Sequence, residues 1–239
     1  MLNPDLDVAA RAAEFAHRRR VLVPQAFTAE TAERLARCLR EEVPWGLATR
    51  SGGESRWLRT EELRTLRANP AEWRKLLEEV HNEARSGYQF FYNSYQMIAA
   101  YKERLDPQLY LHRFLEFLNS PPMIEFARRV TGMADIAKAD AQATRYLPGH
   151  FLRRHDDVYR EGERDSRRAA YVINLTRGWQ ADWGGLLQFL DAAQNVEETW
   201  TPDYNVLAIF AVPTWHCVSC VAPFATEPRL AITGWFRTH

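Results

Sequence analysis

The residues after Gly132 place the strongest constraint on the fold. From there on, the chain passes through eight short strand-like segments, each bounded by Gly, Pro, Asn or Asp. They read ADAQATRYL, HFLRRHDD, RAAYVINLT, GGLLQFLD, VEETWTP, NVLAIFAV, WHCVSCVA and RLAITGWFR. Short strands at this spacing are typical of a β-sandwich or a jelly roll. We therefore predict an all-β second half.

The residues before Gly132 carry helix signals instead. Pro4 follows Asn3, and a proline in the first turn of a helix sacrifices no hydrogen bond. Thr28 precedes apolar residues at helical spacing and suits the N-cap position. The expected helices begin at Asn3-Pro4 and at Thr28, cover 60–67 and 70–84, and form twice within 106–131, on either side of Ser120-Pro121-Pro122. Short strands are expected over 21–27 and 87–97.

No Gly- or Ser-rich linker separates the two halves. We therefore expect one integrated domain over 1–239, with a mostly helical support region over 1–132 and a β core over 133–239. In this α+β arrangement the N-terminal helices pack on one sheet of a jelly roll.

Composition narrows the possible partners and location. Lys and Arg together number 31, as do Asp and Glu, so the formal net charge is zero. Nucleic-acid binders are usually basic, so we expect no nucleic-acid partner. No apolar run approaches the roughly 18 residues of a membrane span, and the N-terminus lacks the apolar core of a secretory signal. Three cysteines are too few for a disulfide framework. We expect a cytoplasmic protein without a membrane partner; the oligomeric state stays open.

A candidate metal site emerges from three residues of the β half. His155 and Asp157 lie two apart in RRHDDV, and residues i and i+2 of a strand face the same way. A second strand-borne histidine, His216, follows much later in the chain. Two histidines and one carboxylate form the facial triad of non-haem Fe(II) oxygenases. Arg229 opens the last strand and suits a bidentate hold on a dicarboxylate.

Each of these residues, considered alone, could have an ordinary structural role and no part in a site. A lone His155 reads as a surface histidine, His216 as a half-buried one, and Arg229 as a surface strand residue. Asp156 is expected to point away from the site if its strand is regular, whereas a bulge would exchange it with Asp157. The order H-x-D, distant H, then R within an all-β half is what makes the metal site the favoured interpretation.

Other sequence features give weaker indications of function. Cys217 and Cys220 face opposite sides of a strand, so they are not expected to form a zinc or redox pair. Six arginines surround the first ligand and form either a solvated loop or a rim that attracts an acidic substrate: Arg153, Arg154, Arg160, Arg164, Arg167 and Arg168. The polar segment 158–168 suits a mobile lid. The aromatic residues of 88–95 are more often core, although Tyr92 to Tyr95 could contact a substrate. Trp179, Trp183 and Trp235 read as structural.

The β half resembles the 2-oxoglutarate/Fe(II) dioxygenase superfamily. The segments that carry the resemblance are TRYLPGHFLRRHDD, RRAAYVINLT, GGLLQFLD, HCVSCV and RLAITGW, within about 134–237. Among its branches the pattern is most similar to the prolyl hydroxylases. The resemblance implies a double-stranded β-helix in which His155, Asp157 and His216 hold the iron and act as the catalytic centre.

The resemblance also implies a set of co-substrate contacts. Arg229 would pair with the distal carboxylate of 2-oxoglutarate, and Thr233 would hydrogen-bond the same group. Tyr146 matches a tyrosine that reaches the co-substrate in prolyl hydroxylases, and Tyr171 can fill a similar role. Asn174 stands where relatives often carry a second tyrosine. Fe(II), 2-oxoglutarate and O2 are the implied reactants, with ascorbate as reductant.

The implied reaction leaves several functions open. The favoured one is hydroxylation of a prolyl residue in a protein, and the same chemistry on a free amino acid or small metabolite is the alternative. A non-catalytic β-helix that binds a metal or dicarboxylate is a third possibility. A fourth is an unrelated jelly-roll module, such as a sugar binder, in which His155 and His216 would lie far apart.

Overall fold

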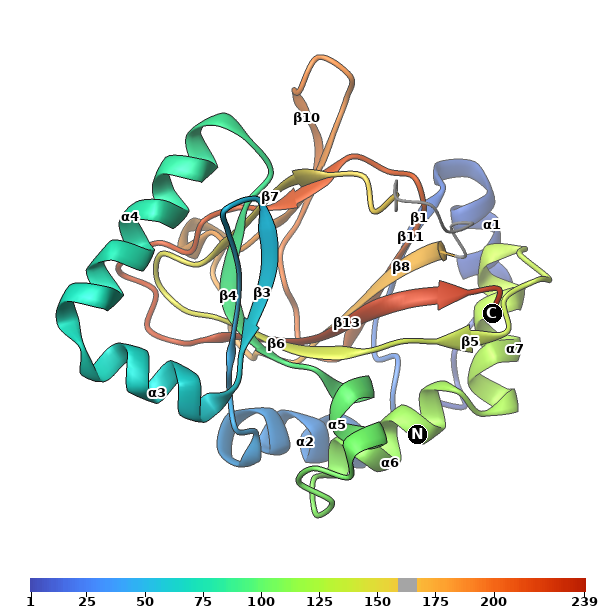
Figure 1. Cartoon of the computed structure of the whole chain (residues 1–239). Helices are drawn as coiled ribbons and strands as arrows, with labels where there is room; N and C mark the ends of the chain where they lie inside the picture. Colours follow the sequence, from blue (N-terminus) through green and yellow to red (C-terminus); the bar gives the residue numbers. More distant parts are fainter. Residues whose placement is uncertain (159–166) are drawn as a thin grey trace.

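The computed structural model describes residues 1–158 and 167–239 (Figure 1). Its helices are α1 (Val8–Arg18), α2 (Ala29–Arg37), α3 (Thr60–Ala68), α4 (Pro70–Ser86), α5 (Met97–Glu103), α6 (Tyr110–Leu118) and α7 (Pro121–Thr131). Its strands are β1 (Arg20–Val23), β2 (Leu47–Ser51), β3 (Glu54–Leu58), β4 (Phe90–Tyr95), β5 (Lys138–Ala139), β6 (Gln142–Tyr146), β7 (Phe151–His155), β8 (Arg167–Asn174), β9 (Leu187–Leu190), β10 (Val196–Trp200), β11 (Val206–Ala211), β12 (His216–Val218) and β13 (Arg229–Arg237). Each of the eight predicted strand segments forms a strand, from β6 to β13.

The strands form two antiparallel layers joined at one strand. The larger layer runs β1-β11-β8-β13-β6-β4, and the smaller layer runs β7-β12-β9-β10. β4 pairs with β6 of the larger layer and with β7 of the smaller one. The β2–β3 hairpin is attached to β4 as well. A strand from the helical half therefore connects the two layers.

Successive side chains of β8 point into two different hydrophobic cores. Ala169, Tyr171 and Ile173 pack in a large core against the helices. Ala170 and Val172 point the other way and pack with Phe189 of the smaller layer. Because neighbouring strand residues face opposite sides, the larger layer presents one face to the helices and one to the smaller layer. The second face is where the candidate site lies.

The helices cover the outer face of the larger layer as expected. Residues of α1, α2, α5, α6 and α7 all enter the large core. Thr28 caps α2 by accepting a hydrogen bond from the Thr31 backbone N–H at 3.4 Å, and Gly132 ends α7 in the left-handed conformation at φ 70°. These caps follow the sequence signals.

Two helix predictions differ from the structure. The first helix starts at Val8 instead of Asn3-Pro4, because Asp7 is the cap and accepts a hydrogen bond from the Ala10 backbone N–H at 2.9 Å. The residues before it are held by a β-bridge between Leu2 and Phe27. Helix α5 was not predicted, since it is short and directly follows the aromatic strand β4.

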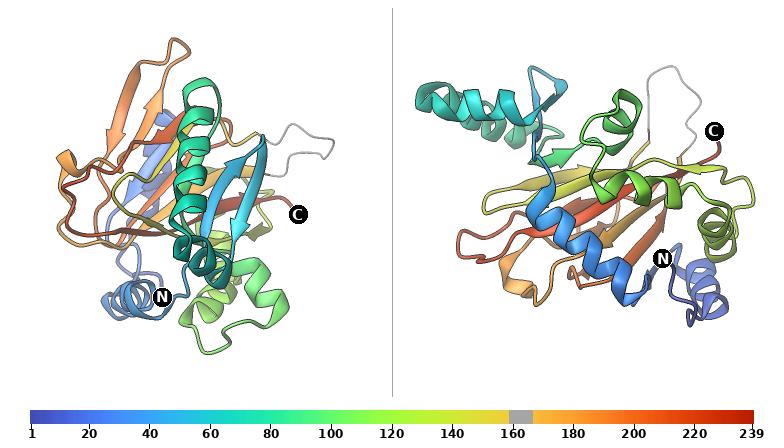
Figure 2. Two further views of the ribbon diagram at one scale, coloured as in Figure 1. Left: turned by 60° about the vertical axis from the view of Figure 1, so that its left-hand side comes forward. Right: turned by 90° about the horizontal axis from the view of Figure 1, so that it is seen from below.

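Helices α3 and α4 pack elsewhere. Figure 2 shows them on a separate flank, beside the β2–β3 hairpin. Leu63 of α3 and Leu76 and Val80 of α4 form a small core there with Leu47 and Phe91. Among the α-helices of residues 1–158 and 167–239, the prediction that the helices cover one sheet face therefore holds for α1, α2, α5, α6 and α7. No helix in the described parts of the chain is long and apolar enough to cross a membrane.

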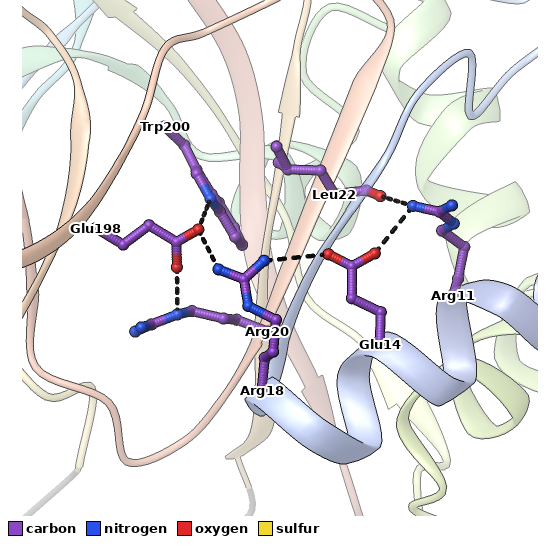
Figure 3. A network of polar contacts seen from close by, with 7 residues as sticks. All are labelled: Arg11, Glu14, Arg18, Arg20, Leu22, Glu198 and Trp200. Atoms are coloured by element: carbon purple, nitrogen blue, oxygen red, sulfur yellow. Dashed lines mark hydrogen bonds and ion pairs between the residues drawn. The ribbon is translucent and has the colours of Figure 1, made fainter.

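A polar network ties the first helix to the far end of the smaller layer (Figure 3). Glu198 of β10 forms ion pairs with Arg18 of α1 at 2.5 Å and with Arg20 of β1 at 2.6 Å. The same carboxylate accepts a hydrogen bond from the Trp200 indole at 2.8 Å. The Arg20 guanidinium also lies 4.6 Å from the centre of the Phe189 ring. Charge pairing and stacking thus fix the protruding β10 strand.

Candidate metal and co-substrate site

Three side chains converge between the two layers. The His155 Nε2 atom lies 3.3 Å from one carboxylate oxygen of Asp157, and His216 Nε2 lies 3.6 Å from the other. The ring centres of the two histidines are 4.1 Å apart. One ligand atom from each residue falls within 4.8 Å of the others, and the described residues contain no second group of this kind. Two imidazole nitrogens and a carboxylate match the donor set of a non-haem Fe(II) site.

The residues meet for a reason that differs from the one predicted. The sequence argument placed His155 and Asp157 on one strand, but β7 ends at His155. Asp157 instead adopts a left-handed backbone conformation at φ 63°, which turns its carboxylate back toward His155. Across the layer, His216 pairs directly with His155, and the register shifts beyond that pair. The β-bulge lies on the strand side of His155 and does not exchange Asp157 with Asp156.

Backbone carbonyls orient both imidazoles. The Nδ1 atom of His155 lies 2.8 Å from the Arg153 carbonyl oxygen, and that of His216 lies 2.8 Å from the Thr214 carbonyl oxygen. A carbonyl only accepts, so each Nδ1 carries the proton and each Nε2 keeps its lone pair. Both lone pairs are directed at the common point beside Asp157. This arrangement is the one that a metal ion requires of its histidine ligands.

The pKa values reflect the crowding of these buried groups. Burial opposes ionisation of Asp157, but the two imidazoles hold its pKa well below the usual range. Burial and the neighbouring His155 lower the pKa of His216 to about 4. Burial also disfavours the charged form of His155, but Asp157 outweighs it and the pKa is raised. At neutral pH the site offers one carboxylate and a neutral His216.

Arg229 of β13 is buried on the face of the larger layer that packs against the smaller layer. Its side chain is only 2% exposed, and burial lowers its pKa. One guanidinium nitrogen donates to Asn174 Oδ1 at 3.5 Å, and the group lies 5.1 Å from the centre of the Tyr146 ring. Its Nε atom has no hydrogen-bond partner, and no described carboxylate pairs with it. A buried cation without an acid is a binding place for a carboxylate ligand.

The surrounding residues leave space for Arg229. Gly185 is the clearest case, because a Cβ there would lie 3.1 Å from Val221, 3.2 Å from Trp179 and 3.3 Å from Arg229. Gly185 also has φ 61°, which side chains rarely adopt.

The structure separates the predicted co-substrate residues into two groups. Tyr146, Asn174 and Thr233 share the inner face of the larger layer with Arg229, as their alternation along β6, β8 and β13 requires. Tyr171 does not reach this face. It packs against the helices, and its hydroxyl donates to the Asp140 carbonyl oxygen at 2.6 Å. Assigning it to the pocket was wrong, because it lies an odd number of residues from Asn174 on one strand.

Two tyrosines near the site were not among the predicted metal or co-substrate residues, although Tyr92 was a candidate substrate contact. Tyr88 places its ring 5.4 Å from that of His155 and is 39% exposed. Tyr92 of β4 stacks on Tyr146 with ring centres 4.9 Å apart, and burial raises its pKa to about 12. The sequence signal was the run of aromatic residues in 87–97, which gave no indication of which face each residue occupies.

Arg167 of β8 and Trp235 of β13 stack on each other and contact Asp157. Arg167 donates to the Asp157 carbonyl oxygen at 2.7 Å and lies 3.9 Å from the centre of the Trp235 ring. The Trp235 indole N–H makes no hydrogen bond of standard geometry, yet it lies close enough to Asp157 to help lower the pKa of that carboxyl. Trp235, expected to be purely structural, therefore also shapes the site.

The remaining sequence candidates have other roles or cannot be placed. Cys217 and Cys220 are free thiols, as is Cys38. Asp156 accepts a hydrogen bond from the Val158 backbone N–H at 3.2 Å, beside the site. Arg153 donates to carbonyl oxygens at the end of α4. Most of the possible lid over 158–168 lies outside the described residues.

Comparisons with known proteins point to one superfamily. A family model described as the 2OG-Fe(II) oxygenase superfamily matches residues 141–237. The prolyl 3-hydroxylase OGFOD1 of Mus musculus is 29% identical over 171 residues, which make up 67% of this chain and 30% of that protein. The chain thus spans less than a third of the length of this relative.

Solved structures share the fold. A Pseudomonas putida prolyl-4-hydroxylase matches with a TM-score of 0.60 and 19% identity, over 97% of this chain and 99% of the other. A Trichoplax adhaerens prolyl hydroxylase, solved with a hypoxia inducible factor peptide, matches with a TM-score of 0.61 and 14% identity, over 97% and 89% of the two chains. The expected double-stranded β-helix is confirmed. Residues 141–237 thus match the model of the 2OG-Fe(II) oxygenase superfamily, and the chain shares its fold with solved prolyl hydroxylases.

Proposed function

We propose that the protein is a 2-oxoglutarate- and Fe(II)-dependent dioxygenase that hydroxylates a prolyl residue in a protein. The observation that carries the proposal is the convergence of His155, Asp157 and His216 within 4.8 Å, together with a buried Arg229 that has no described acid partner. The prolyl substrate is supported by the named relatives, which are prolyl hydroxylases.

Each residue has a defined part in this proposal. His155 and His216 would hold Fe(II) through Nε2, and Asp157 would supply a carboxylate oxygen and offset positive charge. Three ligands on one side of an iron leave the remaining positions for co-substrate and O2. With O2 as the oxidant, bound Fe(II) and 2-oxoglutarate would supply the oxidising chemistry: one oxygen atom ends in succinate as CO2 leaves, and the other ends in the hydroxyl group of the substrate.

Arg229 would bind the far carboxylate of 2-oxoglutarate through a charge-assisted pair. Asn174 holds the guanidinium through its Oδ1 atom, and the Tyr146 ring packs against it. Since the arginine is fully buried, it faces a ligand in a site from which water is largely excluded, where such a pair is stronger.

Tyr88 marks the open side of the site, because it is both next to His155 and partly exposed. We place the prolyl substrate there. We also assign ascorbate as the reductant that keeps the iron in the ferrous state, and we assign the protein to the reducing cytoplasm, in keeping with its three free thiols.

The direct test is succinate formation from 2-oxoglutarate with Fe(II) and ascorbate. The wild type should release succinate, and His155→Ala and His216→Ala should not. His17→Ala, on the surface of α1, is the matched control and should retain wild-type rates. Equal rates for wild type and both triad variants would contradict the dioxygenase assignment.

A second assay separates the substrate classes. Prolyl peptides and free proline are each incubated with the enzyme, and mass spectrometry records the addition of one oxygen atom. Hydroxylation of peptides alone supports the protein substrate. Hydroxylation of free proline alone moves the assignment to a small-molecule hydroxylase with the same chemistry. Binding of 2-oxoglutarate without any oxidation would indicate a non-catalytic binding protein.

A further inference from the structure

Tyr92 belongs to β4, which lies outside the residues matched by the family model. Its side chain is 7% exposed and stacks on Tyr146, whose ring in turn lies 5.1 Å from the Arg229 guanidinium. The charge of Asp157 also contributes to the raised pKa of Tyr92. Through Tyr146, Tyr92 therefore lies near Arg229, which the proposed co-substrate must reach.

A chain of hydrogen bonds fixes what the Tyr92 hydroxyl can do. Gln142 directs its amide nitrogen at the Tyr92 oxygen at 3.3 Å. The amide oxygen of Gln142 is held by Gln96 Nε2 at 3.0 Å and by the Ser94 hydroxyl at 3.2 Å. With its oxygen end occupied by two donors, Gln142 presents its N–H to Tyr92. The Tyr92 oxygen thus accepts here, and its own hydrogen is left to donate elsewhere.

Within the parts of the chain that the structure describes, the Tyr92 hydroxyl makes one hydrogen bond, the one that it accepts from Gln142. Asp157 acts on Tyr92 through charge without a hydrogen bond. Tyr146 lies parallel to it, with an angle of 18° between the rings. A buried hydroxyl with an unused donor costs free energy unless a ligand accepts from it. The fitting partner is an oxygen acceptor on a ligand that Arg229 also binds.

We propose that the Tyr92 hydroxyl donates a hydrogen bond to a carboxylate oxygen of the bound dicarboxylate co-substrate, with Gln142 as the residue that sets its direction. This assignment rests on the proposed function. It makes Tyr92 a co-substrate-binding residue contributed by the helical half, and Gln142 a positioning residue that acts through it.

The test measures binding and does not depend on turnover. Co(II)-loaded protein is titrated with 2-oxoglutarate by calorimetry, and Co(II) affinity is measured separately without 2-oxoglutarate. Tyr92→Phe removes only the hydroxyl and should weaken 2-oxoglutarate binding roughly tenfold to a hundredfold, as for a hydrogen bond to a charged group. Co(II) affinity should stay within about twofold, since the triad is intact.

Tyr95→Phe is the matched control. Tyr95 lies on the same strand, is 8% exposed, and donates to Asp106 at 3.0 Å on the helix side. This variant should bind both Co(II) and 2-oxoglutarate as the wild type does. Should Tyr92→Phe match Tyr95→Phe in its 2-oxoglutarate affinity, the proposal fails. It fails as well if Tyr92→Phe weakens Co(II) binding as strongly as 2-oxoglutarate binding, because Tyr92 would then act on the triad.

A second variant, Gln142→Met, tests the proposal independently if Tyr92→Phe does not fold. The substitution keeps the side-chain length but removes the amide that orients Tyr92, so we expect roughly threefold to tenfold weaker 2-oxoglutarate binding and unchanged Co(II) affinity. Wild-type affinity in this variant overturns the positioning role of Gln142. Wild-type protein that binds Co(II) but no 2-oxoglutarate would instead refute the proposed function itself.

Discussion

Replacing Arg229 with methionine should have opposite effects on the free and the liganded protein. Methionine fills a similar volume without a charge. The guanidinium is buried, lacks a described acid partner and has an unsatisfied Nε, so removing it also removes its desolvation cost. We therefore expect the unliganded variant to be at least as stable as the wild type.

The liganded protein should lose nearly all the stabilisation that 2-oxoglutarate provides. A charge-assisted pair between a guanidinium and a carboxylate is worth about 3 kcal/mol, or roughly a hundredfold in affinity. At a concentration one hundred times its Kd, the ligand stabilises the wild type by about 2.7 kcal/mol. At the same concentration the variant would gain only about 0.4 kcal/mol.

Thermal unfolding of the Co(II)-loaded protein, with and without 2-oxoglutarate, reads out both effects. For a chain of this length 1 kcal/mol corresponds to about 2–4 °C in Tm. We expect the ligand to raise Tm by about 5–10 °C in the wild type and by about 1–2 °C in Arg229→Met. Arg145→Met is the control, since Arg145 lies opposite Leu230 on the paired strand and bonds Asn93 instead. An unliganded Arg229→Met protein that melts several degrees below wild type, or one that keeps the full ligand shift, would refute the reasoning.

Three further predictions test other parts of the structure. Glu198→Ala should destabilise the protein by about 1–3 kcal/mol in denaturant unfolding, because it leaves Arg18 and Arg20 without their shared acid. The control is Glu61→Ala, which should cost under about 0.5 kcal/mol because Glu61 and its partner Arg64 are 74% and 72% exposed. Tyr171→Phe should lower stability by about 1 kcal/mol and leave the Kd for 2-oxoglutarate unchanged, since its hydroxyl bonds Asp140 on the helix side; a weakened Kd would return Tyr171 to the pocket. Burial lowers the pKa of His150 to about 4, so the unfolded chain binds more protons and stability should fall as pH drops from about 6.5 toward 4; His150→Gln should flatten that part of the stability profile, and an unchanged slope would contradict the assignment.

The sequence predicted elements whose signals are local. Thr28 and Gly132 mark helix ends through their own side chains or backbone freedom, and both act as predicted. The eight segments after Gly132 alternate or are continuously apolar, which is sufficient to identify strands. The start of α1 was wrong because Asp7 and Pro4 are both acceptable helix signals, and tertiary pairing of Leu2 with Phe27 decides between them.

The geometry of the site could be predicted only in part, because it depends on contacts between residues far apart in the sequence. The proximity of His155, Asp157 and His216 was predicted, but regular strand geometry is not what brings Asp157 to His155. Tyr171 was misplaced because the sequence does not reveal which face of β8 is the inner one. Tyr92 was predicted as a possible substrate contact and not as a co-substrate residue, since its position depends on pairing between β4 and strands far along the chain.

The position of β4 has a consequence for dissecting or recombining this protein. β4 is the strand that pairs with both layers, and it carries Tyr92 into the site from sequence well before residue 133. A fragment cut at the boundary between the helical and β halves would expose unpaired edges on β6 and β7 and would lack one wall of the site. Chimaeras that graft the β half onto the helices of a relative therefore need to transfer β4 with it. The residues that build the site do not all lie on one side of the boundary between the helical and β halves.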